Sequence, residues 1–85
     1  MNRVLIELFC AATIKKYDFW IPKSMLIKDV IKRLTEDIED YENVEELFGN
    51  VDDIMLYLDD RKVILNKEYT VEQSGIVSGQ MLMMV

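Results

Sequence analysis

The 85-residue chain contains no histidine and a single cysteine, Cys10. The missing histidine removes the commonest general base, the usual activator of serine and cysteine nucleophiles, and the commonest transition-metal ligand. One cysteine can form neither an internal disulfide nor a CxxC site, and no base or cluster of cations lies beside it in sequence. We therefore expect Cys10 to be a half-buried apolar residue rather than a reactive thiol. We expect no enzyme, with no catalytic residue, no metal site and no cofactor.

Long hydrophobic runs are also missing. No apolar run approaches the roughly 20 residues that a membrane span needs, and Glu7 places a charge where a secretory signal would have none. We find no repeat, low-complexity segment or linker, so we expect a single domain over residues 1–85. Half of the residues (51%) are hydrophobic, which favours a folded core. These features predict a soluble cytoplasmic protein without membrane insertion.

The charge is unevenly distributed along the chain. Sixteen acidic and ten basic residues give a net charge of −6. Nine of the acids fall between Glu36 and Asp53, where there is no Lys or Arg; the other residues hold seven acids and all ten bases. The overall balance disfavours binding to nucleic acid, and the asymmetry indicates an oriented surface.

Alternating apolar residues predict two strands near the N-terminus, over residues 4–9 and 17–21. The segment between them is short enough for a hairpin, although it lacks the Gly or Asn of a tight turn. Trp20 falls on the face opposite the expected core. The residues expected on the buried faces are Val4, Ile6 and Leu8 in the first strand, and Tyr17, Phe19 and Ile21 in the second.

The segment after Pro22 has the period of a helix. Apolar residues recur on one stripe over about residues 25–40, and Ser24 can cap the first turn. Residues 43–46 resemble the capping box of a second, short turn of helix that closes near Gly49. The stripe of the long helix consists of Ile27, Ile31, Leu34 and Ile38.

Three more strands are expected in the second half, at residues 54–58, 62–65 and 81–85, with a tight turn at 59–61 and a compact connector at 66–77. The last strand directs Leu82 and Met84 inward. The resulting order is two strands, one helix, two strands, a connector and a last strand. This is the order of the β-grasp fold, an α+β design in which a mixed sheet of four to five strands packs on one long helix.

Several stretches of the sequence resemble known proteins. "YTVEQSGIVSGQMLMMV" (residues 69–85) resembles the last part of ubiquitin, and "DDRKVIL" (residues 59–65) resembles the reversal between its third and fourth strands. More narrowly, "YDFWIPKSMLIKDVI" (residues 17–31) and the "SGIVSGQMLMM" ending are similar to YukD/EsaB-type proteins, small ubiquitin-like components of Gram-positive type VII (WXG-type, ESX-like) secretion systems. The sequence departs from that family at Gly79-Gln80, where Gly-Asp is common, and in its longer acidic stretch.

The resemblance implies a non-covalent accessory or regulatory role on the cytoplasmic side of the secretion apparatus. Its partners would be proteins, including cytoplasmic domains of that machinery. Ubiquitin and the sulfur carriers instead react through a flexible Gly-Gly tail, because only residues without Cβ fit the slot of an activating enzyme. This sequence ends Met83-Met84-Val85, inside a predicted strand. Unless the chain is cut short, we do not expect a covalent modifier or sulfur carrier, which stays the alternative function.

Two candidate surfaces for a partner lie on the sheet. Met81, Met83 and Val85 are expected on the outer face, which in ubiquitin-like domains is the usual partner-binding surface; burial of this face in a homodimer is the alternative. Trp20 is either an interface anchor, since Trp is enriched at hot spots, or a side chain that covers the edge of the hairpin or packs on lysine side chains.

The acidic stretch is the third candidate. It is either a docking patch for a basic surface or a solvated connector kept soluble by its charge. Helix C-termini prefer cations, so this charge opposes folding, with no lysine near in sequence to relieve it. We therefore expect reversal of Glu36, Glu39, Glu42 and Glu45 to Lys to leave the fold intact. The candidate contact residues are Glu36, Glu39, Asp40, Glu42, Glu45 and Glu46.

Overall fold

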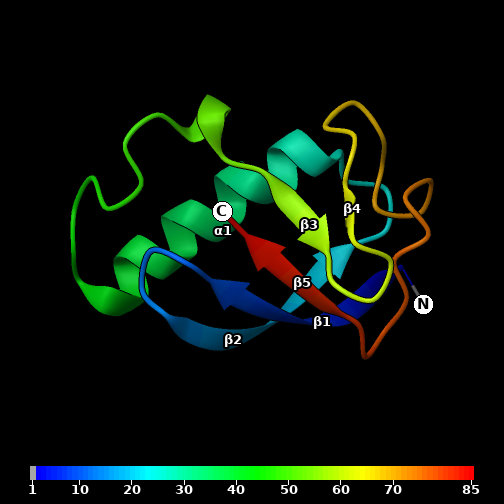
Figure 1. Ribbon diagram of the computed structural model, residues 1–85, viewed down its shortest axis with the longest axis horizontal. Helices are drawn as coiled ribbons and strands as arrows, with labels where there is room; N and C mark the ends of the chain where they lie inside the picture. The colour runs from blue at the N-terminus through cyan, green and yellow to red at the C-terminus, as the bar shows by residue number, and fades with distance from the viewer. Residues whose placement is uncertain (1) are drawn as a thin grey trace.

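One long helix lies against a five-stranded mixed sheet in the computed structural model, which describes residues 2–85 (Figure 1). The α+β architecture predicted from the order of elements is therefore confirmed. Both the number of strands and the single long helix agree with the expectation. The elements are β1 (Arg3–Cys10), β2 (Lys15–Pro22), α1 (Ile27–Glu42), the 3-10 helix η1 (Val51–Asp53), β3 (Leu56–Leu58), β4 (Val63–Ile64) and β5 (Met81–Met84).

The sheet joins the two halves of the chain at its centre. The strand order is β2-β1-β5-β3-β4, and β5 pairs in parallel with β1 and antiparallel with β3. The β1–β2 and β3–β4 pairs are antiparallel. The first and last strands thus lie side by side in the middle, and β2 and β4 form the two edges (Figure 1).

The β1–β2 hairpin forms without a glycine in its turn. Ile14 takes the left-handed conformation with φ +56°, and its N–H donates to the Cys10 carbonyl at 2.8 Å. Ile21 is buried as predicted, whereas Tyr17 and Phe19 are only partly buried because they belong to an edge strand. Cys10 is fully buried rather than half-buried, since it lies on the same face of β1 as Val4, Ile6 and Leu8 and belongs to the core cluster.

The core lies between α1 and the sheet. The predicted helical stripe is buried throughout, and the inward residues of β1 and β5 close the other side of the same cluster. Burial of this apolar surface is the main stabilising contribution, at about 25 cal/mol per Å². The helical residues of the core are Ile27, Val30, Ile31, Leu34 and Ile38, and those of the two central strands are Val4, Ile6, Leu8, Cys10, Leu82 and Met84.

The start of α1 differs from the prediction. The helix begins at Ile27, two residues later than expected, and its N-cap is Leu26, which makes no side-chain capping bond. Ser24 therefore does not cap it. The connector supplies the acceptors instead, because the N–H groups of Ile27 and Lys28 donate to the carbonyls of Tyr69 (2.8 Å) and Lys67 (3.1 Å). These bonds satisfy groups that a capping side chain would otherwise have to reach.

The end of α1 also corrects a prediction. Asn43 closes the long helix in the left-handed conformation (φ +56°) and does not open a second one. The N–H groups of Asn43 and Val44 donate to the carbonyls of Asp40 (3.3 Å) and Glu39 (3.1 Å), the pattern of a Schellman ending. The capping box predicted at residues 43–46 is therefore wrong. The only short helix in residues 43–53 is η1, which Asn50 caps at the Asp52 N–H (3.0 Å).

Candidate functional site

A line of apolar side chains crosses four strands on the face of the sheet away from α1. In the sheet register, Met83 of β5 lies beside Phe9 of β1 on one side and Tyr57 of β3 on the other. Tyr57 in turn lies beside Ile64 of β4. Residues beside one another in neighbouring strands point to the same face, so these four side chains form one continuous surface, here called the apolar row.

The residues predicted for this face lie where expected. Met81 and Met83 are half-buried while their neighbours Leu82 and Met84 are buried, which confirms the predicted alternation. Val85 extends the face: its backbone exchanges hydrogen bonds with Met55 at 3.0 and 2.8 Å, and both side chains are exposed.

The rest of the apolar row was not among the predicted site residues. The alternation in β1 already places Phe9 on the face opposite the buried Val4, Ile6 and Leu8. The sequence alone could therefore have predicted that Phe9 lies on the outer face. Tyr57 and Ile64 could be joined to Met83 only once the strand order and register were known.

Two carboxylates lie next to the apolar row. Glu7 sits beside Met81 and directly opposite Asp18 of β2. Neither carboxylate belongs to any of the salt bridges found within residues 2–85. Like charges directly opposite in a sheet are unfavourable, so this part of the outer face favours an incoming cation.

Trp20 is partly exposed (43%) and lies under the guanidinium of Arg3, whose Cζ is 5.5 Å from the ring centroid. In the β1–β2 register Trp20 is opposite Leu5, on the same outer face as the apolar row. A cation stacked on an indole ring is attracted by the ring quadrupole. Trp20 thus lies beside Arg3 on the outer face of the hairpin and stays partly exposed to solvent.

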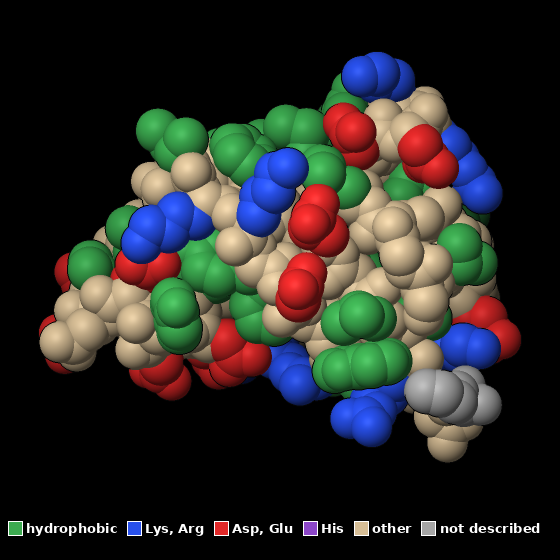
Figure 2. All heavy atoms as spheres, turned by 90° about the horizontal axis from the view of Figure 1, so that it is seen from below, with side chains coloured by type: hydrophobic (Ala, Val, Ile, Leu, Met, Phe, Trp, Pro, Cys, Tyr) green, Lys and Arg blue, Asp and Glu red, His purple; other side chains and the backbone are tan. Residues whose placement is uncertain are grey.

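The acidic residues after Glu36 divide into two groups. Acidic side chains gather at the left end of the molecule in Figure 2, the end where Figure 1 places the C-terminus of α1. Glu39 accepts a hydrogen bond from the Leu47 N–H (2.9 Å), and Glu42 is bound by the hairpin, so both have partners within the chain. Those exposed to solvent are Glu36, Asp37, Asp40, Glu45, Glu46, Asp52 and Asp53.

Glu42 ties the end of α1 to the hairpin. Its carboxylate accepts from Lys15 Nζ at 2.8 Å and from the Tyr17 hydroxyl at 2.6 Å. The hydrogen bond from Lys15, then that from Tyr17, lowers the pKa of Glu42 below its ordinary value. The hydrogen bond to Glu42 also raises the pKa of Lys15. The pKa of Tyr17 is raised by burial and, second, by its hydrogen bond to Glu42. A lysine remote in sequence therefore relieves the charge that was expected to go unrelieved.

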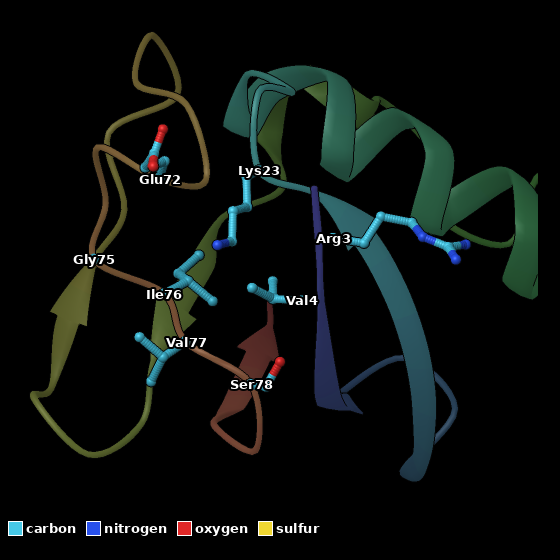
Figure 3. Close-up of a pocket in the computed structure, with 8 residues that line it drawn as sticks. All are labelled: Arg3, Val4, Lys23, Glu72, Gly75, Ile76, Val77 and Ser78. Atoms are coloured by element: carbon cyan, nitrogen blue, oxygen red, sulfur yellow. The ribbon is translucent and has the colours of Figure 1, made fainter. Parts of the chain in front are cut away.

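A pocket of about 360 Å³ opens at the other end of the molecule, between the start of β1 and the connector (Figure 3). The side chains of Val4 and Ile76 point toward its middle, and that of Lys23 reaches in beside them. Arg3 lies at its border with its guanidinium turned away. The pocket thus has an apolar floor with both Lys23 and Glu72 in its lining, and it lies apart from the apolar row.

Residues 2–85 contain no group of three His, Cys, Asp or Glu side chains arranged to hold a metal ion. Within the same range, no helix has both the length and the apolar character needed to cross a membrane.

No family model and no curated protein matches the sequence. Solved structures match it in fold. The UBL domain of Plasmodium falciparum Dsk2 superposes with a TM-score of 0.73 and 13% identity, over 98% of this chain and 96% of that chain. The UBL domain of yeast Ddi1 superposes with a TM-score of 0.71 and 16% identity, over 99% of this chain and 88% of that chain. The N-terminal ubiquitin-like domain of the 4931431F19Rik protein superposes with a TM-score of 0.71 and 17% identity, over 99% of this chain and 74% of that chain.

At these identities the similarity concerns the fold. The two-layer arrangement and the sheet described above agree with it over nearly the whole chain. The chain therefore has the ubiquitin-like β-grasp fold.

Proposed function

We propose that this protein is a non-covalent protein-binding module that recognises its partner with the outer face of the sheet. The observation that carries the proposal is the apolar row, in which Phe9, Met83, Tyr57 and Ile64 lie in line on the face away from α1. Aromatic side chains are typical anchors of interfaces, and methionine adapts to the shape of a partner. A continuous apolar surface on a sheet face is a feature of interaction sites.

The charges beside the apolar row indicate the chemistry of the partner. Glu7 and Asp18 oppose each other next to Met81. A Lys or Arg of the partner placed between these carboxylates would relieve their repulsion while an apolar side chain covers Met83. We therefore propose a partner surface with an apolar centre and a basic flank.

The exposed acids at the end of α1 are a second candidate contact. Glu36, Asp40, Glu45 and Glu46 point to solvent, whereas Glu39 and Glu42 have partners in the chain. Exposed charges steer an oppositely charged partner and are screened by salt. A contribution from this end would appear as an association rate that falls with ionic strength.

The more specific proposal is a cytoplasmic accessory or regulatory component of a bacterial type VII secretion system. Its support is the similarity of residues 17–31 and 74–84 to YukD/EsaB-type proteins. The neighbouring genes provide a first test, since a WXG-type substrate and a membrane ATPase beside this gene would be expected.

The binding test uses the cytoplasmic domains of that ATPase as the probe, titrated by calorimetry with this protein. We expect binding that Met83→Asp abolishes and that Val77→Asp, on an exposed residue of the connector, leaves unchanged. Equal binding by both variants, or no binding by the wild type, would overturn the proposal.

The alternative function, a covalent modifier or sulfur carrier, predicts a different outcome. Incubation with ATP and a cognate activating enzyme would then yield an adenylate or thioester at Val85. We expect neither product, and mass spectrometry of the intact protein distinguishes the two functions.

A further inference from the structure

The edge strand β2 carries a sequence that is complementary to itself. Lys23 donates its N–H to the Asn2 carbonyl at 2.8 Å, which makes the pair of residues 2 and 23 a hydrogen-bonded one. Bonded and non-bonded pairs alternate along an antiparallel ladder. The odd-numbered residues of β2 therefore bond to β1, and the even-numbered ones direct their N–H and C=O groups away from it. Lys16 and Asp18 thus present backbone groups at the edge of the sheet.

A second copy can pair antiparallel with this edge in only a few registers. A register centred on Asp18 opposes two Asp18 carboxylates, which repel each other. A register centred on Phe19 places Asp18 opposite Trp20 and Lys16 opposite Pro22, which has no N–H to donate. A register centred on Tyr17 places Lys16 opposite Asp18 of the second copy and, by symmetry, Asp18 opposite Lys16.

The register centred on Tyr17 also matches apolar residues. It brings the hairpin turn of one copy, which carries Ile14 just before β2, next to Trp20 of the other. Ile14 is 78% exposed and Trp20 is 43% exposed, so both have apolar surface to cover. On the helix side of the same edge, Tyr17 lies near the twofold axis, and the exposed ring of Tyr41 packs edge-on against it with centroids 6.1 Å apart.

We propose that two copies of this chain associate through β2, centred on Tyr17, to form one continuous ten-stranded sheet. Four backbone hydrogen bonds would join Lys16 and Asp18 of each copy to Asp18 and Lys16 of the other. Asp18 would gain a cation opposite it to offset Glu7 on β1. The contact is small for a permanent dimer, so the association is reversible and depends on concentration.

The twofold axis of such an edge-to-edge pair is perpendicular to the sheet. Both α1 helices then lie on one side, and both apolar rows face the other. The dimer therefore leaves the proposed partner-binding surface open and presents it twice, which would raise the avidity for a partner with two sites.

The test measures the dissociation constant of the dimer by sedimentation, from micromolar to millimolar protein. In the dimer of Lys16→Glu, two carboxylates would face each other at each of the two symmetric positions. In the dimer of Asp18→Lys, two ammonium groups would face each other at the same positions. We expect each variant to weaken the dimer about tenfold or more. An equimolar mixture of the two variants should restore it. In the mixed dimer the carboxylate introduced at position 16 faces the ammonium group introduced at position 18, and the native Asp18 of one copy faces the native Lys16 of the other.

The controls separate this contact from net charge and from folding. Lys62→Glu and Asp53→Lys make charge changes of the same sizes at exposed residues in the second half of the chain, outside β2, and should leave the dimer unchanged. Circular dichroism confirms that each variant folds. The proposal is overturned by a wild type that stays monomeric at millimolar concentration, by a mixture that does not dimerise, or by a dimer that Met83→Asp dissociates while the β2 variants do not.

Discussion

Glu7 of β1 and Asp18 of β2 lie directly opposite each other in the antiparallel pair, so two carboxylates face one another across the outer side of the sheet. Cross-strand pairs of this kind normally combine opposite charges or apolar groups. The arrangement does not assist folding of the single chain. Both proposals explain it, because a basic partner would neutralise Glu7 and a second copy would bring Lys16 to Asp18.

Replacing Glu7 by Gln should stabilise the isolated protein and weaken its binding. The change removes one of two opposed charges and keeps the shape of the side chain. We expect a gain of about 0.2–1 kcal/mol in the free energy of unfolding, measured by urea denaturation, together with weaker binding to the proposed partner. Glu72→Gln, on an exposed connector residue, is the matched control and should change neither. A loss of stability in Glu7→Gln would show that the carboxylate supports the fold.

The Lys15–Glu42 pair should make stability depend on pH. Because the pKa of Glu42 in the folded protein is lowered below its ordinary value of 4.5, its contribution is fully present above that value. It is lost as the pH falls through the lowered pKa. The pKa of Lys15 is raised, so its contribution is lost only as the pH rises above the ordinary value of 10.5.

Thermal unfolding of Glu42→Gln from neutral to strongly acidic pH tests this. The variant should melt below the wild type at neutral pH, and the two curves should converge in acid as Glu42 becomes protonated. Glu36→Gln is the control, since Glu36 is exposed and should show no such difference. If the melting temperatures of wild type and Glu42→Gln differ by the same amount at every pH, the pH dependence does not come from Glu42.

The fold could be predicted because its signals are local. Val4, Ile6 and Leu8 alternate over one strand, and the spacing of Ile31, Leu34 and Ile38 is that of one helix face. Each signal depends on a few neighbouring residues, so it can be recognised without knowledge of the rest of the chain. The order of the elements then restricts the architecture to few choices.

Two of the errors concern bonds between residues distant in sequence. The N–H group of Ile27 is satisfied by the Tyr69 carbonyl, which no local rule about Ser24 could reveal. Lys15 reaches Glu42 only because the hairpin turn folds against the end of α1. For the same reason, alternation predicted Met81 and Met83 on the outer face, while the full apolar row required the strand order.

Ile31→Asp should unfold the domain. Ile31 is 1% exposed, between α1 and the sheet, where a carboxylate would have no partner. Burial of an unpaired charge costs several kcal/mol, which is comparable with the total stability of about 5–15 kcal/mol of a small domain. Circular dichroism should show loss of the folded signal. Val77→Asp, on a residue that is 57% exposed, introduces the same group without burial and should fold.

Charge reversal in the acidic stretch should have two different effects, although the sequence alone predicts that the fold tolerates all such changes. Glu36→Lys and Glu45→Lys alter exposed side chains and should leave the melting temperature nearly unchanged. Glu39→Lys removes the acceptor for the Leu47 N–H, and Glu42→Lys places a second ammonium group beside Lys15.

We expect the pair Glu39→Lys/Glu42→Lys to melt clearly below the wild type, because it breaks contacts between α1, the hairpin and the following loop. The pair Glu36→Lys/Glu45→Lys carries the same change in net charge and is the matched control. Equal melting temperatures for the two pairs would mean that the contacts of Glu39 and Glu42 contribute nothing measurable. Where the control pair folds normally but loses salt-sensitive binding to the ATPase domains, the exposed acids act in docking, and unchanged binding assigns them to solubility.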